Sequence, residues 1–265
     1  MTRLIRAVLV LTALVLLIFM TGFIIQAPWA TVLWPWPDTP LSYLFVGSIL
    51  AAVALPVGWI GLTGELAALR SGALDFTVSY AGISGFFVLF YPQAGLSSPY
   101  TVFAVGGLIL NGIIYLLSRR IAFQDSRPMP SLVRGSFLVF ALVLIGVGMA
   151  LVTGQPHIFP WPLKPESSVL VGWIFLGAAV YFLHGVAVPL WHNACGQLLG
   201  FLAYDLVLLG PFISHLDRVH PDHRLSLMLY LSVLIYSTLL AVYFLFIHRT
   251  TRLIGRQQPP DRWLV

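Results

Sequence analysis

The sequence predicts an all-α integral membrane protein with eight transmembrane helices, arranged as two parallel repeats of four helices with both termini in the cytoplasm. Three observations lead to this fold class. Of the 265 residues, 59% are hydrophobic and only 9% are charged, whereas a soluble domain carries about 25% charged residues. Apolar stretches recur along the whole chain, and one aromatic motif occurs twice at a fixed separation.

Each apolar stretch is long enough to form a helix that crosses a bilayer. About 20 apolar residues span the hydrocarbon core, where a helix satisfies its own backbone hydrogen bonds. Eight stretches meet this requirement, and they cover residues 4–26, 41–63, 74–92, 100–118, 135–153, 168–190, 195–214 and 225–247. The first is longer than the apolar core of a signal peptide, which has about 7–15 residues, so we expect it to be retained as a span.

The basic residues indicate which loops face the cytoplasm. If the N-terminus is inside, all but three of the 14 lysines and arginines lie in inner segments, and the three others are Lys164, Arg218 and Arg224. The positive-inside rule predicts this asymmetry, and with it a cytoplasmic linker (119–134) and a cytoplasmic tail (248–265). The net charge of +5 therefore reflects topology, and we expect no nucleic-acid partner.

A doubled motif indicates an internal duplication. Seven of the 13 residues from 35–47 recur 125 positions later, and the Pro-Trp-Pro of 35–37 returns at 160–162. Each copy follows the first span of a four-helix unit, so the two units comprise residues 1–118 and 135–247. Four is an even number of spans, so both units enter the membrane from the same side and the repeat is parallel.

Each Pro-Trp-Pro copy is predicted to form a rigid elbow at the membrane interface. Tryptophan suits the headgroup level, where its ring is buried and its N–H stays in contact with water. Pro40 and Pro165 suit the first positions of the helices that follow. The alternative is an aromatic loop that contacts a ligand.

The second unit carries the polar residues that are most unusual inside a membrane. Asp205 falls near the middle of the seventh span, where a carboxylate costs about 2.5–3.5 kcal/mol on insertion scales, so it should face the protein interior and have a partner. On the same span Asn193, Gln197 and Tyr204 form a stripe that Asp205 borders. His184 lies at a similar depth on the sixth span and is a candidate partner for Asp205. We predict a ligand or ion site at these five residues. The alternative is a structural role in which Asp205 holds neighbouring helices together.

The last outer loop concentrates histidine and aspartate. The segment from 214 to 224 contains His215, Asp217, His220, Asp222 and His223. Imidazoles and carboxylates at this density suit Zn²⁺ or another divalent metal. Their spacing matches no established metal motif, and the alternative is an interfacial network in which Asp217 pairs with a neighbouring arginine or caps the last helix.

The residues that are missing limit the remaining chemistry. A single cysteine, Cys195, excludes an intrachain disulfide and a cysteine-rich metal site. The sequence contains no Gly-rich phosphate loop, His-Glu-x-x-His or Gly-x-Ser-x-Gly motif, and it identifies no cofactor. Glu65 and Asp75 lie at the inner boundary of the membrane, where we expect both to be solvated.

Two phrases resemble those of a family of uncharacterised bacterial multi-pass membrane proteins. They are WPWPDTPLS (34–42) and SHLDRVH (214–220), which match the family's Trp-Pro-Trp-Pro-x-Thr-Pro elbow after the first span and its His-x-Asp-Arg before the last. The second elbow departs from the pattern, with Leu163-Lys164 where the first has Asp38-Thr39. The resemblance covers these short motifs and the helix pattern between them. It implies a multi-pass protein of the bacterial inner membrane and carries no activity.

Three functional hypotheses follow from these residues. A small transporter, channel or transport-associated subunit would bind a small polar solute or ion near Asp205. A non-catalytic scaffold, which partners other membrane proteins or a second copy of itself, would need only packing. A metal-dependent membrane enzyme would use the His/Asp loop. In each case the lipid bilayer surrounds the helices.

Overall fold

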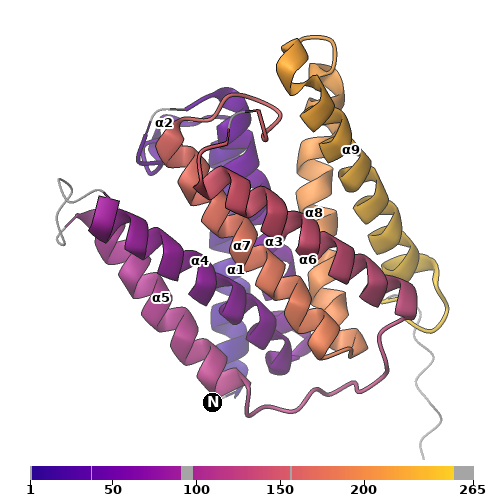
Figure 1. The fold of residues 1–265 in the computed structure, drawn as a ribbon. Coiled ribbons are helices and arrows are strands. Elements are labelled where there is room, and N and C mark those ends of the chain that lie inside the picture. Colours follow the sequence, from indigo (N-terminus) through magenta and orange to yellow (C-terminus); the bar gives the residue numbers. More distant parts are fainter. Residues whose placement is uncertain (1, 37, 91–97, 156, 254–265) are drawn as a thin grey trace, which may run out of the picture.

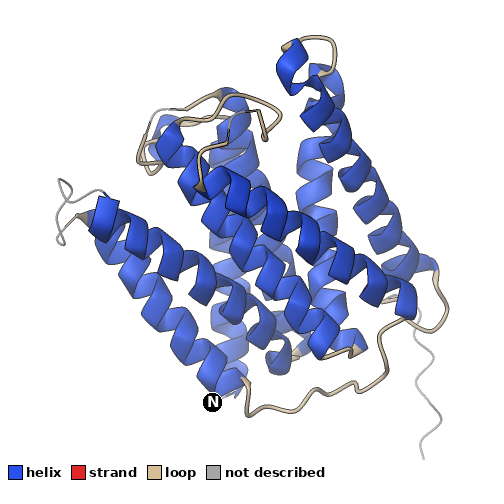
Figure 2. Cartoon of the chain, viewed as in Figure 1, coloured by secondary structure: helices blue, strands red, loops and turns tan. Residues whose placement is uncertain are grey.

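The computed structural model describes residues 2–36, 38–90, 98–155 and 157–253. Within these ranges the regular elements are helices (Figure 2). The long ones are α1 (Thr2–Ile24), α3 (Pro40–Thr63), α4 (Leu69–Phe90), α5 (Pro99–Ser118), α6 (Ser131–Val152), α7 (Pro165–Ala187), α8 (Trp191–His215) and α9 (Pro221–Val242). The short ones are α2 (Pro28–Thr31), the 3-10 turn η1 (Leu66–Ala68) and the π-helical turn η3 (Tyr243–Ile247).

The predicted fold class and number of spans are confirmed for the described part of the chain. Eight of its helices are long and apolar enough to cross a membrane, with α4 extended by η1 and α9 by η3. Proline begins α3, α5, α7 and α9, at a position where its missing N–H costs nothing. Gly64 ends α3 in a left-handed conformation with φ of 81°.

The third span begins earlier than the sequence predicts. It starts at Leu66 rather than at residue 74, so Asp75 lies inside a helix instead of at its end. Asp75 is half-buried and its Oδ1 accepts a hydrogen bond from the Ser79 hydroxyl at 3.2 Å. The expectation that Asp75 is solvated is therefore wrong.

The helices alternate between two ends of the bundle (Figure 1). We call one the linker end, because residues 119–130 cross it beside the start of α1 and the end of η3. We call the other the elbow end, because it carries residues 25–36 and 157–164 together with the turn between α8 and α9.

Helix pairs in the first half recur in the second. Helix α1 packs on α3 as α6 packs on α7, and α4 packs on α5 as α8 packs on α9. The main contacts between the halves are α3 with α8 and α4 with α7. In each contact the second helix of one half packs on the third helix of the other, as expected for two copies related by a two-fold axis. The duplication itself stays a prediction.

Glycines bring α4 and α7 into close contact. A Cβ atom on Gly82 would lie 1.8 Å from the ring of Trp173, and one on Gly177 would lie 1.9 Å from the hydroxyl of Ser79. Because both contacts need the space of a missing side chain, these two glycines set how closely the halves approach.

A carboxylate at the elbow end joins the two copies of the motif. Asp38 accepts hydrogen bonds from the hydroxyls of Ser42 at 2.7 Å and Ser167 at 2.6 Å, which are equivalent positions in the two copies. Trp161 is only 3% exposed and its Nε1 donates to the Ser42 hydroxyl at 2.9 Å. The prediction of a water-facing indole N–H is therefore wrong for Trp161. Trp36 is half-buried and stacks on a phenylalanine of α4.

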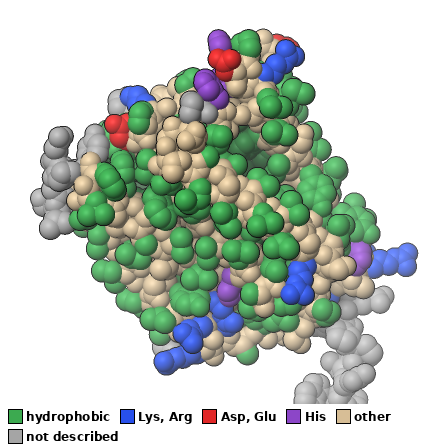
Figure 3. All heavy atoms as spheres, viewed as in Figure 1, with side chains coloured by type: hydrophobic (Ala, Val, Ile, Leu, Met, Phe, Trp, Pro, Cys, Tyr) green, Lys and Arg blue, Asp and Glu red, His purple; other side chains and the backbone are tan. Residues whose placement is uncertain are grey.

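The surface has the distribution expected for a protein surrounded by lipid. Hydrophobic side chains cover the middle of the face seen in Figure 3, and charged side chains lie mostly toward its two ends. Helices α1 and α5 are the least buried spans, and many of their leucine, isoleucine and valine side chains are exposed. Lipid would cover these faces in a membrane.

The contact between α4 and α7 can be tested with a pair of glycine substitutions. We expect Gly82→Ala to destabilise the protein by about 1–3 kcal/mol, because the new methyl group overlaps the Trp173 ring. Gly85→Ala on the same helix is the control, since its Cβ would meet nothing within 4 Å. The measurement is the midpoint of denaturant unfolding in detergent, and equal midpoints for the two variants would contradict the close contact.

Candidate functional site

Helix α8 carries a row of polar side chains through the protein interior. His192, Asn193, Gln197, Tyr204 and Asp205 lie along it, and all except Tyr204 are buried. Helix α8 is also the most buried of the eight spans. Four of the five residues predicted from the sequence therefore lie on one interior helix, and the fifth, on α7, is described below.

Asp205 is fully buried and only partly satisfied. Its exposed fraction is 0%. Its Oδ2 accepts hydrogen bonds from the hydroxyls of Ser237 at 2.7 Å and Thr238 at 3.1 Å, both on α9. Its Oδ1 is buried without a hydrogen-bond partner. The carboxyl thus has one hydrogen-bonded oxygen and one free acceptor in the membrane interior.

Tyr204 links α8 to α9 and to the first half. Its hydroxyl is hydrogen-bonded to that of Tyr230, and its ring meets Phe45 edge-on with centroids 6.1 Å apart. Helix α9 begins at the elbow end, and Tyr230 lies about two turns nearer that end than Ser237, the partner of Asp205, so this phenol pair lies on the elbow side of the carboxyl.

Gln197 is a second partly satisfied group, two turns toward the linker end. Its Nε2 donates to the carbonyl of Tyr181 at 2.5 Å, while its Oε1 is buried without a partner. Phe201 lies between Gln197 and Asp205 in the sequence, and its ring centroid is 4.5 Å from that of Phe182 and 4.7 Å from that of Phe140. These three rings form an aromatic cluster beside this part of α8.

Asn193 lies in the linker-end part of this row of polar side chains, and His184 of α7 lies next to it. The Asn193 amide donates to the carbonyl of Val188 at 3.0 Å and lies 3.5 Å from Nδ1 of His184. Its Oδ1 accepts from the hydroxyl of Ser71 on α4 at 2.9 Å. The predicted pair between His184 and Asp205 is therefore not formed, because each has other partners.

A second cluster at the linker end was not predicted from the sequence. His192 places Nδ1 at 2.5 Å from Oε2 of Glu65 and Nε2 at 3.3 Å from Oδ2 of Asp125. Arg127 completes the chain through an ion pair with Asp125 at 2.6 Å. The four residues come from the α3–η1 turn, the linker and the start of α8, so the cluster ties both halves to the linker.

Glu65 is the anchor of this cluster. It is only 1% exposed, and it also accepts a hydrogen bond from the backbone N–H of Gln124 at 3.0 Å. The expectation that Glu65 is solvated is wrong. The linker folds back over the carboxylate and supplies partners that a water-filled boundary would otherwise supply.

The charge state of Asp125 follows from its neighbours. Partial burial favours its neutral form, but hydrogen bonds from the Arg127 side chain and backbone, with the charges of His192 and Arg127, outweigh this effect. The pKa of Asp125 is therefore lowered from its ordinary value of 3.8.

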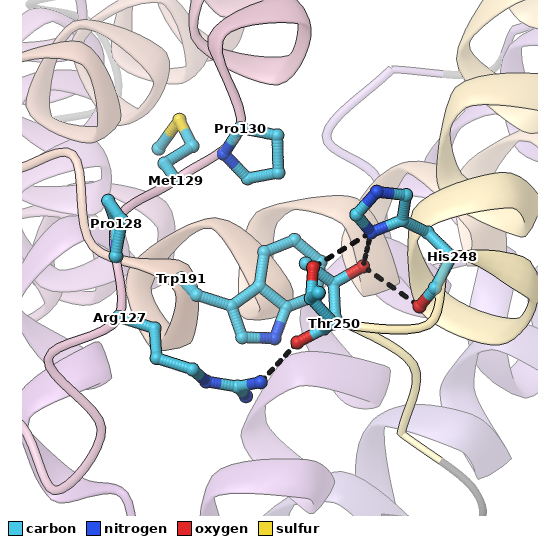
Figure 4. A pocket seen from close by; sticks show the side chains of 8 residues that line it. Arg127, Pro128, Met129, Pro130, Trp191, His248 and Thr250 are labelled. Atoms are coloured by element: carbon cyan, nitrogen blue, oxygen red, sulfur yellow. Dashed lines mark hydrogen bonds between the residues drawn. The ribbon is translucent and has the colours of Figure 1, made fainter.

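A pocket of about 320 Å³ adjoins the cluster (Figure 4). It lies where residues 127–130 meet the start of α8 and residues 248–251. Trp191 forms one wall, and its buried indole N–H has no hydrogen-bond partner. Arg127 lines the pocket and donates to the carbonyl of Thr250. The pocket thus joins the linker to the chain that follows η3.

The histidines of the α8–α9 turn have separate environments. His223 is buried and its Nδ1 lies 2.8 Å from the carbonyl of Phe159. His220 accepts from the N–H of Asp222 and caps α9. Across the residues that the structure describes, no group of three or more His, Cys, Asp or Glu side chains is placed to hold a metal ion. A metal at His215, Asp217, His220 and His223 stays a prediction that needs rearrangement of this turn.

Comparison with known proteins adds no relative. No family model, no curated protein and no solved structure matches this chain.

The linker-end cluster can be tested through its pH dependence. The pKa of Asp125 is lowered in the folded protein, so its ionised form stabilises the fold above the ordinary pKa of 3.8. This stabilisation is lost as the pH falls through the folded pKa. We expect Asp125→Asn to lower the unfolding midpoint at pH 6 and to flatten its fall below pH ~4.

The control for this experiment is Asp222→Asn, since Asp222 is exposed at the opposite end of the bundle. Its midpoint should follow that of the unmodified protein across the pH range. An Asp125→Asn protein with an unchanged midpoint at both pH values would show that the cluster does not hold the linker.

Proposed function

We propose that this multi-pass membrane protein transports a proton or a small cation through its second half, with the Asp205 carboxyl as the binding group. The observation that carries the proposal is the buried Oδ1 of Asp205, which has no hydrogen-bond partner. A carboxylate at mid-membrane costs about 2.5–3.5 kcal/mol on insertion scales, and an unsatisfied acceptor adds to that cost. A proton or cation on Oδ1 would supply the missing partner.

The donor set around Asp205 suits a small charged ligand rather than a large solute. The Ser237 and Thr238 hydroxyls both donate to Oδ2 and leave Oδ1 available. Oxygen ligands of this kind bind hard cations and protons. The site is closed, with Asp205 fully buried, so the ligand would have to exchange in another state of the protein.

The other polar side chains on α8 indicate the direction in which the ligand would exchange. Gln197 Oε1 is a second free acceptor toward the linker end, about 12 Å from Asp205 by helix rise. The aromatic cluster of Phe140, Phe182 and Phe201 lies beside this part of α8. We infer that these rings must move for a proton or cation to pass between the two acceptors.

The distribution of basic residues supports a cytoplasmic linker end, and the resemblance of the elbow motifs supports a bacterial inner membrane. Both belong to the proposal. The competing role is a scaffold in which Asp205 only holds α8 against α9. The two roles differ in whether the free oxygen of Asp205 must be able to bind and release a ligand.

Substitution of Asp205 by asparagine separates these roles. Asparagine keeps an oxygen that can accept from Ser237 and Thr238, so the contact with α9 should survive, while the acidic group is lost. In liposomes containing a pH-sensitive dye, with K⁺ or Na⁺ gradients applied in turn, we expect Asp205→Asn to reduce flux at least tenfold. Asp222→Asn is the control and should conduct like the unmodified protein. Flux that is undiminished in a folded Asp205→Asn protein would refute the proposal.

Solvent access at the same position gives an independent measurement. In a Cys195→Ser background, Asp205→Cys should react with a small water-soluble thiol reagent over minutes, because transport requires the site to open. The control is Leu208→Cys, one turn further along α8 and also fully buried. Complete protection of both cysteines in the folded protein would favour the scaffold.

A further inference from the structure

A groove at the linker end lies apart from the row of polar side chains on α8. It has a volume of about 430 Å³ and runs between the start of α1 and the end of α3. Two arginines and several aliphatic residues line it, among them Arg3, Arg6, Val10, Leu11, Leu14 and Leu62. The groove is therefore cationic at one end and apolar along its length.

The cationic end has hydrogen-bond donors to spare. Arg6 donates from Nε to the carbonyl of Gly61 at 2.9 Å and from one terminal nitrogen to that of Leu62, which leaves three of its five N–H groups. Arg3 is exposed and makes no hydrogen bond or ion pair within the described chain. No carboxylate of the described residues neutralises either arginine, so an external anion would find two guanidinium groups.

The apolar part extends along the direction of the membrane normal. Leu14 lies about 16 Å from Arg3 along the axis of α1, at 1.5 Å per residue. Leu11, Leu14 and Leu62 are more than half exposed. A soluble anion would use the arginines and leave these leucines uncovered, whereas a lipid would cover both parts at once.

We propose that this groove is a binding site for an anionic phospholipid. Its phosphate lies between Arg3 and Arg6, where guanidinium groups form charge-assisted hydrogen bonds with phosphate oxygens. One acyl chain follows Val10, Leu11 and Leu14 toward the middle of the bilayer. Because Arg6 also bonds the last carbonyls of α3, a bound phosphate orients a side chain that already holds α1 against α3.

The proposal is tested by native mass spectrometry of the full chain, stripped of lipid in detergent and titrated with phosphatidylglycerol or with phosphatidylcholine of the same acyl chains. We expect the unmodified protein to retain phosphatidylglycerol more tightly than phosphatidylcholine. Arg3→Gln should weaken phosphatidylglycerol binding roughly fivefold, as expected for one basic residue near an anionic headgroup. It disturbs no contact of Arg6.

Two further variants make the result specific. Ala7→Trp, at an exposed position in the groove, should block the acyl chain and weaken phosphatidylglycerol binding with both arginines in place. Arg119→Gln removes one exposed charge from the residue that follows α5, at the same end of the bundle, and should leave binding unchanged. Equal weakening by Arg119→Gln, no effect of Ala7→Trp, or equal retention of the two lipids would each overturn the proposal.

Discussion

Hydrocarbon offers no hydrogen-bond partner to a polar group, so every polar side chain within the spans must be satisfied by another part of the protein. The packing of the bundle follows from this constraint. Helix α8 carries the densest set of buried polar residues, and it is also the most enclosed span. Its neighbours supply the partners: Ser71 from α4, the Tyr181 carbonyl from α7, and Ser237 with Thr238 from α9. Helices α1 and α5 are the least buried spans.

The same constraint explains how the two halves are joined by polar contacts at each end of the bundle. At the elbow end, Asp38 of the first half binds a serine from each copy of the motif. At the linker end, Glu65 of the first half meets His192 of the second, and Asp125 of the linker lies on the other side of the imidazole. Between the two ends, glycines bring the halves close together, and the Ser71 hydroxyl of α4 donates to Asn193 of α8. Asp205 and Gln197 each keep one buried carboxyl or amide oxygen without a hydrogen-bond partner.

The span count was predictable because it depends only on local apolar length, which each segment carries by itself. The start of α4 was not, since the polar residues from Glu65 to Asp75 read as a loop until their distant partners are known. Glu65 and His192 are 127 positions apart, and no periodicity links them. The available signal was that a glutamate stands in a short turn between two apolar spans, where a charge needs a reason. Equal depth suggested His184 as the partner of Asp205, but depth leaves the rotation of α7 about its axis undetermined. Asp205 itself was found correctly as buried, because a central carboxylate admits few other environments.

The main contacts between the halves, α3 with α8 and α4 with α7, have a consequence for biosynthesis. The partners of the first half are made long after it: Trp173 follows Gly82, and His192 follows Glu65 by 127 residues. At roughly 5–20 residues per second, synthesis of that interval takes about 6–25 s. During this time α3 and α4 are already in the membrane, and the surfaces that will contact α8 and α7 are uncovered. The nascent first half must therefore wait in a loosely assembled state, with Glu65 exposed to water at the linker end until His192 and the linker cover it.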